Sequence, residues 1–306
     1  MKPLLALFAV AFVLTTRPCQ AADGQSAALA RAIQQAGLDP ELCYRVRDLV
    51  FAKQDLKFYF NDGHLMFLRP VEGRRLAAVY VADVPGADAE IMVFPPHSSE
   101  RLALSVFTKS PNLNEHFIAS VFLFTDNSGA EMLELLKDQK PDPSAGVMIA
   151  SQFDSVVRNI AQSFEMRLVL DMFSTDWEQN GLFFAAISGK TLGSFDAILD
   201  PRAREQILLG QLATRDERRF FDTWTSFQSR AVRTGARPQP ESQVVPENFV
   251  IDATLTPELR LKAKTTIELT AKAATGRAVT FDLSRHMQVT DVRLDGEPVE
   301  FFVRES

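Results

Sequence analysis

The sequence predicts an α+β protein that is mainly β, with a few helices. Apolar residues alternate with polar ones through many short segments, and this period of two is typical of strands with one buried face. Phenylalanine is unusually frequent, with 24 residues in 306, and aromatic side chains favour strands. Glycine and proline are spread along the whole chain, as expected if turns separate the strands. The length suggests two domains.

The first 22 residues have the order of a secretory signal. Lys2 precedes an apolar run over residues 4–14, and small residues follow at Ala21 and Ala22. The run is too short to span a bilayer comfortably, and we expect cleavage after Ala21 or Ala22. A retained anchor is the alternative. The remainder is therefore predicted to be exported, to the periplasm or the cell exterior, with no transmembrane segment after cleavage.

Charge and cysteine content narrow the choice of partner and of chemistry. The net charge is −6, and removal of the signal makes it more negative because Lys2 and Arg17 leave with it. A nucleic-acid partner would call for a clustered basic face, so none is expected. Cys19 also leaves with the signal, and Cys43 then has no disulfide partner. A small buried hydrophobe is the favoured role for Cys43, because the sequence places no histidine beside it.

Residues 23–232 are predicted to form an accessory module built as a meander. A short helix over 26–36 ends at Gly37. Alternation over 56–60 leads to Asn61-Asp62-Gly63, which we interpret as a tight hairpin turn. Further strands are expected over 76–81, 91–94, 102–107, 117–124, 182–187, 195–199, 206–212 and 221–227, with a corner at Asp200-Pro201.

Two helices are predicted inside this module, near residues 128–136 and 152–173. The second is long and amphipathic, and its apolar stripe comprises Phe153, Val156, Val157, Ile160, Phe164, Leu168 and Met172. Such a stripe could bind a partner helix. Burial against the meander is the favoured interpretation, because an exposed apolar stripe of this size is a liability in solution.

A linker and a second β-region follow. Residues 233–247 carry three prolines and no hydrophobic period, as a linker would. Residues 248–306 alternate again over 249–255, 259–271 and 279–283, with Gly276 marking a turn and Asp295-Gly296 marking a hairpin. The pattern is still that of a sheet at Ser306, so we expect the start of a truncated β-sandwich.

The order of these strands resembles the amino-terminal β-sandwich of aminopeptidase-N-like (gluzincin) zinc metallopeptidases. The resemblance rests on F-x-I-x-A-x-L at 249–255, the Leu, Lys and Thr-rich strand 259–271, V-T-F-D-L at 279–283 and V-x-x-V-x-L-D-G at 289–296. The front module resembles the extension that precedes this sandwich in some exported bacterial relatives. It does so at Gly63-x-x-x-x-Leu68, Phe94-Pro95-Pro96-x-x-x-Glu100-Arg101, Asp200-Pro201-Arg202 and Asp222-x-Trp224-x-Ser226-Phe227. An unrelated exported sandwich with the same periodicity is the alternative.

The resemblance implies a non-catalytic front segment of a zinc-dependent aminopeptidase-like protein. In that family a zinc-bound water attacks the amino-terminal peptide bond, and the ligands lie in a downstream catalytic domain. None of those ligands maps onto this sequence, so zinc is expected only in that absent domain. The implied partners are that downstream domain and, through it, peptide substrates. The alternative function is a stand-alone exported β-rich binding or scaffold module without enzymatic activity.

We accordingly assign no catalytic, cofactor-binding or metal-ligating residue. A zincin requires H-E-x-x-H on a helix, and no pair among His64, His97, His116 and His286 has that spacing. Glu115-His116 is half of the inverted motif, but Asn112 stands where the first histidine belongs. His97 and Glu100 could contribute two ligands, although a surface loop is the favoured interpretation.

Two further patterns suggest chemistry but have simpler explanations. Ser188-Gly189-Lys190-Thr191 is similar to the end of a phosphate-binding loop, yet Phe184 occupies the position that requires the first glycine. We therefore predict a hairpin turn there. Asp138 and Asp142 form an acidic pair in a proline-rich loop and are expected to be solvated.

Overall fold

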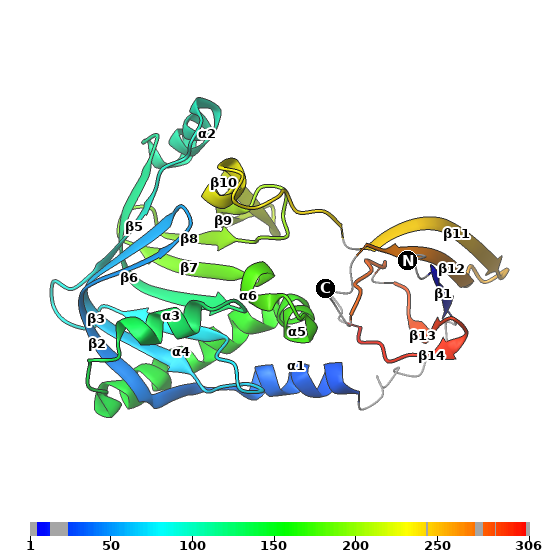
Figure 1. Cartoon of the computed structure of the whole chain (residues 1–306), viewed down its shortest axis with the longest axis horizontal. Helices are drawn as coiled ribbons and strands as arrows, with labels where there is room; N and C mark the ends of the chain where they lie inside the picture. Colours follow the sequence, from blue (N-terminus) through cyan, green and yellow to red (C-terminus); the bar gives the residue numbers. More distant parts are fainter. Residues whose placement is uncertain (1–4, 13–23, 243, 273–277, 285, 304–306) are drawn as a thin grey trace. The chain divides into compact units, whose positions relative to one another are not determined.

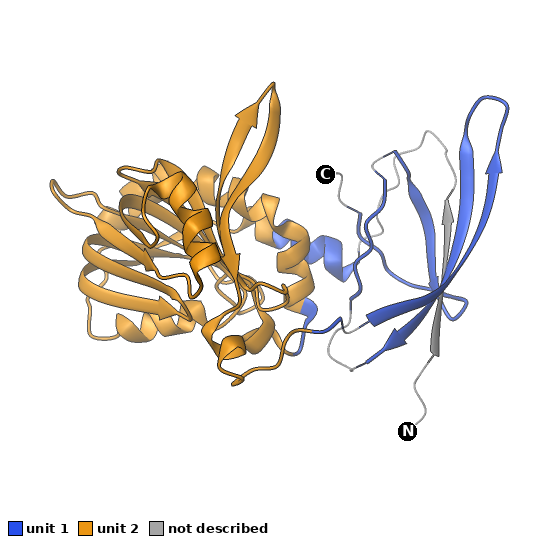
Figure 2. Ribbon diagram, turned by 90° about the horizontal axis from the view of Figure 1, so that it is seen from above, with its two compact units in different colours: residues 1–32, 173–175, 241–306 blue, residues 33–172, 176–240 orange. Residues whose placement is uncertain are grey.

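The computed structural model describes residues 5–12, 24–242, 244–272, 278–284 and 286–303, with the backbone alone for 5–12. Strands make up 43% of the chain and helices 25%, so the protein is mainly β, as predicted. The chain forms two compact units (Figure 2). Unit 1 comprises residues 1–32, 173–175 and 241–306, and unit 2 comprises residues 33–172 and 176–240.

Unit 2 is built on one antiparallel sheet of nine strands, in the order β10-β9-β8-β7-β6-β4-β3-β2 (Figure 1). Its strands are β2 (Leu38–Lys53), β3 (Leu56–Leu68), β4 (Ala77–Val81), β5 (Ala89–Val93), β6 (Leu113–Phe124), β7 (Phe183–Gly189), β8 (Ser194–Leu199), β9 (Ile207–Arg215) and β10 (Arg218–Phe227). Both β4 and β5 pair with β3 on one side and β6 on the other. They therefore lie end to end in a single position of the sheet.

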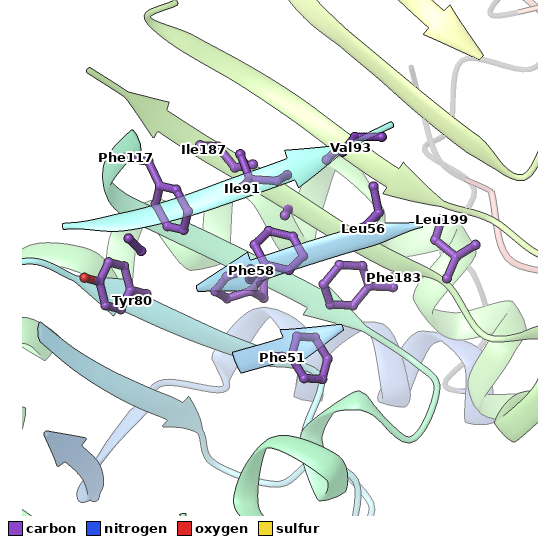
Figure 3. Close-up of a cluster of buried hydrophobic side chains, with 14 of the residues drawn as sticks. Phe51, Leu56, Phe58, Tyr80, Ile91, Val93, Phe117, Phe183, Ile187 and Leu199 are labelled. Carbon is purple, nitrogen blue, oxygen red and sulfur yellow. The ribbon is translucent and has the colours of Figure 1, made fainter. Parts of the chain in front are cut away.

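One face of this sheet carries an aromatic core (Figure 3). Phe58 on β3 lies edge to face with Phe122 on β6, at 5.4 Å between ring centroids, and with Phe183 on β7, at 5.9 Å. Such arrangements are favoured by the ring quadrupoles. Leu104 of α2 (Ser98–Thr108) and Met132 of α3 (Ser128–Leu135) belong to the same core. Ten of the 24 phenylalanines belong to this core.

Helices α4 (Pro143–Ser163) and α5 (Glu165–Phe173) pack near the opposite face. Gly146 of α4 lies against β2, and a Cβ atom there would stand 2.5 Å from the carbonyl oxygen of Pro40. The residues predicted as one helix over 152–173 are helical, but they belong to two helices, because α4 ends at its C-cap Phe164 and α5 begins at Glu165. Helix α4 also begins earlier than predicted, because the Asp142 side chain accepts a hydrogen bond from Ala145 N–H at 3.1 Å and caps it. Its predicted stripe is partly covered, since Val157 is buried whereas Val156 is 40% exposed.

Two predictions in unit 2 are wrong. Residues 102–107 are helical rather than extended, because the Glu100 carboxylate accepts a hydrogen bond from His97 N–H at 3.0 Å and closes a capping box at the start of α2. The hairpin expected at residues 61–63 is also absent, since β3 continues through them and the turn lies at residues 54–55. Gly63 instead allows β4 to approach closely, because a Cβ atom there would stand 2.6 Å from the carbonyl oxygen of Val81.

The remaining predictions for the front module agree with the structure. Helix α1 (Gln25–Gln35) and α3 occupy the positions expected for the two short helices. Strands β7 to β10 lie where the sequence predicts them, and β7 and β8 are joined by a turn at residues 190–193. Two single-turn helices complete the unit, α6 (Trp177–Asn180) and α7 (Arg230–Arg233).

Unit 1 contains a five-stranded antiparallel sheet in the order β11-β12-β1-β13-β14. Its strands are β1 (Leu5–Phe12), β11 (Val244–Leu255), β12 (Leu261–Ala271), β13 (Val289–Leu294) and β14 (Glu297–Pro298). The hairpin at Asp295-Gly296 is confirmed, with φ angles of 50° and 89° that suit a tight turn. Residues 279–283 form no strand, contrary to prediction, because alternation of apolar residues does not by itself supply a pairing partner.

The residues predicted as a signal contribute a strand to unit 1. Strand β1 pairs with β12 on one side and with β13 on the other. The expected cleavage sites after Ala21 and Ala22, together with Cys19 and Gly276, lie outside the described residues. Residues 238–242, within the predicted linker, have no regular structure where they are described, and the division between the units falls after Pro240. No helix in the described ranges is both long and apolar enough to cross a bilayer.

The expectation of one buried face holds for only one of the two long strands of unit 1. Ile267 and Leu269 of β12 are buried. On β11, by contrast, Phe249 is 55% exposed and Ile251 is 64% exposed. The alternation predicted the strand correctly, but nothing in the described part of unit 1 covers the apolar residues of β11.

Candidate functional site

The four histidines occupy unrelated places in the structure. The His97 backbone N–H donates to Glu100 at the start of α2, so the His97 and Glu100 pair serves a helix cap. His116 Nδ1 lies 2.9 Å from Asp88 Oδ2 on the surface of unit 2, and His286 lies in unit 1. Throughout the described residues, no three His, Cys, Asp or Glu side chains are grouped as metal ligands would be.

His64 belongs to a buried polar cluster on β3. Its Nδ1 lies 2.8 Å from Asp83 Oδ1, and its Nε2 lies 3.6 Å from Asp142 Oδ2. Cys43 lies nearby on β2, where it pairs with Met66, two positions along the ladder from the Arg45 and His64 pair. Burial, followed by the charges of Asp142 and Asp83, raises the pKa of the Cys43 thiol to about 12. The thiol is therefore protonated at neutral pH and is a poor nucleophile, which agrees with the structural role expected for it.

The acidic pair of the proline-rich loop, Asp138 and Asp142, does not act as a unit, because only Asp142 belongs to this cluster. The carboxylate of Asp142 accepts the Ala145 N–H and the Ser144 hydroxyl, and the Ala145 bond is the largest cause of the lowered pKa of Asp142. Asp142 is thus a helix cap that also faces His64, and its side chain remains 43% exposed to solvent, as predicted. Asp138 is exposed, as predicted. These contacts hold α4 against β2 and β3 and leave no catalytic pair of carboxylates.

A second buried cluster surrounds Asp171 on α5. Its carboxylate accepts hydrogen bonds from Arg167 Nε at 2.9 Å and from the Thr125 hydroxyl at 2.5 Å, and Arg202 Nη2 lies 3.0 Å away. Arg167 also pairs with Asp200 at 2.8 Å. The cluster joins α5 to β6 and to the corner at Asp200-Pro201. Because every charge has an opposite partner, it is a structural network.

Glu115 gives a physical reason for the turn between β7 and β8. This side chain is 3% exposed, and its Oε1 accepts the backbone N–H groups of Thr191 at 2.6 Å and Leu192 at 3.0 Å. A buried carboxylate thus occupies the position where an anion would have to bind. The hairpin interpretation of residues 188–191 is confirmed.

A hollow of unit 2 lies between β2 and α3, and we call it the β2/α3 groove. It has a volume of about 740 Å³ and is lined by Val50, Phe51, Ala52, Asn127, Ala130, Glu131, Glu134 and Leu135. Val50 is 47% exposed and Leu135 is 45% exposed. The groove combines an apolar strand and an acidic helix.

Charge in the β2/α3 groove is predominantly negative. Lys53 at the end of β2 pairs with Asp126 at 3.1 Å and with Glu131 at 2.7 Å. Glu134 has only an exposed contact with Lys137, three residues along the chain. Sequence reasoning predicted α3 but missed the groove. The available signal was the spacing of residues 127, 130, 131, 134 and 135, which fall on one face of a helix.

Unit 1 contains a smaller hollow of about 230 Å³. It is lined by Leu259, Leu261, Ala263, Ser284, His286, Met287 and Gln288. Its walls are largely apolar, and it lies beside β12, on the sheet whose β11 side chains are exposed. No known protein family, no curated protein and no solved structure matches this chain.

Proposed function

We propose that this chain is the non-catalytic front segment of an exported, zinc-dependent aminopeptidase-like protein. Peptide hydrolysis would be performed by a downstream domain outside this sequence, which would also hold the zinc. Residues 23–232 would be an accessory module and residues 248–306 the start of a β-sandwich. The partners would be that catalytic domain and its peptide substrates.

The observation that carries this proposal is the uncovered apolar surface of unit 1. Its exposed large apolar residues are Phe249, Val250, Ile251, Leu255, Leu259, Val279, Phe281, Leu283 and Val303. Of these, Phe249, Ile251 and Leu255 lie at alternate positions of β11 and share one face of the sheet, and soluble proteins rarely leave such an apolar face in water. In a sandwich, a second sheet packs about 10 Å from the first and covers such side chains. A further layer supplied by additional polypeptide would account for this surface.

The pairing of β11 with β12 adds support. The F-x-I-x-A-x-L strand pairs with the Leu, Lys and Thr-rich strand over its whole length, from Phe249 opposite Ile267 to Leu255 opposite Leu261. The Asp-Gly turn then connects β13 to β14. These are three of the four segments on which the resemblance to the metallopeptidase sandwich rests, and the fourth, residues 279–283, forms no strand.

Extension of the chain tests the proposal. The coding sequence after Ser306 is expected to continue into further strands and an H-E-x-x-H helix. The extended protein should then bind one zinc ion, hydrolyse amino-acid arylamides and protect the β11 amides from hydrogen exchange. The chain ending at Ser306 should do none of these. Arylamide turnover by that chain with added zinc, or a stop codon directly after Ser306, would contradict the proposal.

The exported state has its own test, because the proposed signal and β1 are the same residues. Mass spectrometry of the secreted protein should give a mature amino terminus at Ala22 or Asp23. Strands β12 and β13 would then lose β1 as their shared neighbour, leaving two edges for other polypeptide to cover. A secreted protein that retains residues 5–12 would refute cleavage and would support β1 as a permanent strand.

A stand-alone exported binding module is the second candidate function, and the β2/α3 groove favours it. This function requires no downstream domain. It predicts a protein that ends at Ser306 and binds its ligand through unit 2 alone. The coding sequence after Ser306 distinguishes the two functions directly.

A further inference from the structure

We propose that the β2/α3 groove binds an extended, basic and apolar peptide segment of another protein, which adds as a strand to the free edge of β2. The inference concerns unit 2 alone and does not depend on which of the two functions is correct. It rests on an open strand edge, the direction of its backbone groups and the chemistry of the helix beside it.

The edge of β2 is open along the groove. Strand β2 is the last strand of its sheet and pairs with β3 on one side only. On its other side, the described residues make backbone contacts near Cys43 and Tyr44, where Asp142 N–H donates to the Cys43 carbonyl at 2.7 Å and Tyr44 forms a bridge with Pro141. An exposed strand edge of this kind is a template for another chain.

The turn that joins β2 to β3 sets the direction of the free backbone groups. Lys53 pairs with Leu56 across the two-residue turn, and Phe51 pairs with Phe58. In a two-residue hairpin the closing pair is hydrogen-bonded, and the pairs then alternate along the ladder. Phe51 is therefore bonded to β3, whereas the N–H and C=O groups of Val50 and Ala52 point toward the open edge. Val50 and Ala52 are also the two exposed residues of β2 among those that line the groove.

Helix α3 provides the opposite wall and determines the side chains that fit. Ala130 is small and leaves room for an apolar side chain beside Leu135. Glu131 and Glu134 place two carboxylates along the groove, and Lys53 pairs with Glu131 and with the nearly buried Asp126 beside it. The exposed contact between Glu134 and Lys137 contributes little and exchanges readily. The excess negative charge favours a ligand with lysine or arginine.

Charge also argues for a foreign peptide over a second copy of this chain. A symmetric dimer through two β2 edges would present the same patch on both subunits. The acidic face of each α3, with Glu131 and Glu134, would lie beside the paired edge in both copies. Like charges brought together across an interface oppose association, whereas a basic strand gains from the same groups.

Fluorescence anisotropy with short defined peptides tests the inference on the full chain. The probe is a labelled, capped hexapeptide of alternating lysine and valine, and its control has glutamate in place of lysine. Two further probes carry N-methyl groups on one or the other alternate set of amides. We expect saturable 1:1 binding of the lysine probe, at least tenfold weaker binding of the glutamate probe, and loss of binding for only one methylated probe. The other methylated probe should bind, because a strand added to one edge uses alternate amides.

Protein variants locate the site. Ala52→Pro removes one outward N–H at an edge position where proline is tolerated, and it should weaken binding about five- to tenfold. Glu134→Gln should weaken the lysine probe about two- to fivefold, whereas Glu217→Gln, at the distant β9–β10 turn, should have no effect. Hydrogen exchange should show new protection at Val50 and Ala52 in the complex.

Three results would overturn the inference. The first is failure of the lysine probe to bind at millimolar concentration, and the second is equal binding of the two methylated probes. The third is binding of the lysine probe by Ala52→Pro as tightly as by the parent protein, with no protection from hydrogen exchange in β2. Concentration-dependent dimerisation that Ala52→Pro abolishes, without peptide binding, would assign the edge to a second copy instead.

Discussion

Arg167 Nε donates to Asp171 Oδ2 at 2.9 Å across one turn of α5, and the Asp171 side chain is fully buried. Although burial opposes the charged form of Arg167, Asp200 and Asp171 together raise its pKa. Arg167 therefore remains charged inside unit 2, where its hydrogen bonds to Asp171 and Asp200 compensate for its lost hydration.

Removal of the buried carboxylate should be costly. We expect Asp171→Ala to lower the free energy of unfolding by about 3–5 kcal/mol, because Arg167 and Arg202 would lose their shared partner. Asp200→Ala is the matched control, since Asp200 also pairs with Arg167 but is partly exposed, and it should cost about 1 kcal/mol. Urea denaturation measures both. Equal losses of unfolding free energy in the two variants would show that the burial of Asp171 does not add to the cost of removing its carboxylate.

Asp196 predicts a pH dependence of stability. Burial raises the pKa of the Asp196 carboxyl from its ordinary value near 3.8 to about 6, and its cross-strand neighbours Ala186 and Gly210 offer no side-chain donor. Between about pH 4 and pH 6 the folded state retains a proton that the unfolded state releases. Its stabilising contribution is therefore complete below pH 4 and is lost as the pH rises through 6, by up to about 3 kcal/mol.

A neutral replacement isolates this effect. Asp196→Asn should be more stable than the parent at pH 7.5, and the difference should disappear below pH 4. Asp138→Asn, at an exposed position, serves as the control and should leave the pH profile unchanged. Chemical denaturation at a series of pH values gives the comparison. A stability difference that is the same at pH 3.5 and pH 7.5 would exclude titration of Asp196 as its source.

Cys43 should be unreactive in the folded protein. Its thiol is buried and has a pKa raised to about 12, so little thiolate forms at pH 8. With Cys19 replaced by serine, we expect an aromatic disulfide reagent to label Cys43 only after denaturant is added. Stability should also fall as the pH rises from about 9 toward 12, because the unfolded thiol ionises first, and Cys43→Ala should reduce this slope. Rapid labelling without denaturant would contradict the burial of the thiol.

The segment between the units should be the first site of proteolysis. The described residues of 238–242 have no regular structure, and the Glu241 side chain is 76% exposed. A glutamate-specific protease should cut after Glu241 before it cuts within unit 2, because exposed irregular backbone fits a protease cleft. The released tail should then be digested faster than unit 2, since its β11 apolar residues are uncovered. An equally resistant tail would count against an incomplete sheet in unit 1.

Local patterns predicted much of the fold but misplaced particular elements. The apolar stripe near residues 152–173 and the Asp295-Gly296 turn were readable, because helical periodicity and turn chemistry act over a few residues. The turn predicted at residues 61–63 is wrong, because glycine is required at Gly63 by the close approach of β4 and not by a turn. The strand predicted at residues 102–107 is wrong, because the capping contact between His97 and Glu100 starts a helix there despite the strand-like alternation.

The sequence by itself determined a mainly β protein with few helices, since residue periodicity and turn residues report local conformation. Only the tertiary structure decided that β4 and β5 share one position in the sheet, that Glu115 fills the β7–β8 turn and that Val50 faces α3 across a groove. These features join residues tens of positions apart, and the free energy that fixes them comes from long-range pairing and burial. Short-range sequence patterns carry no record of those contacts.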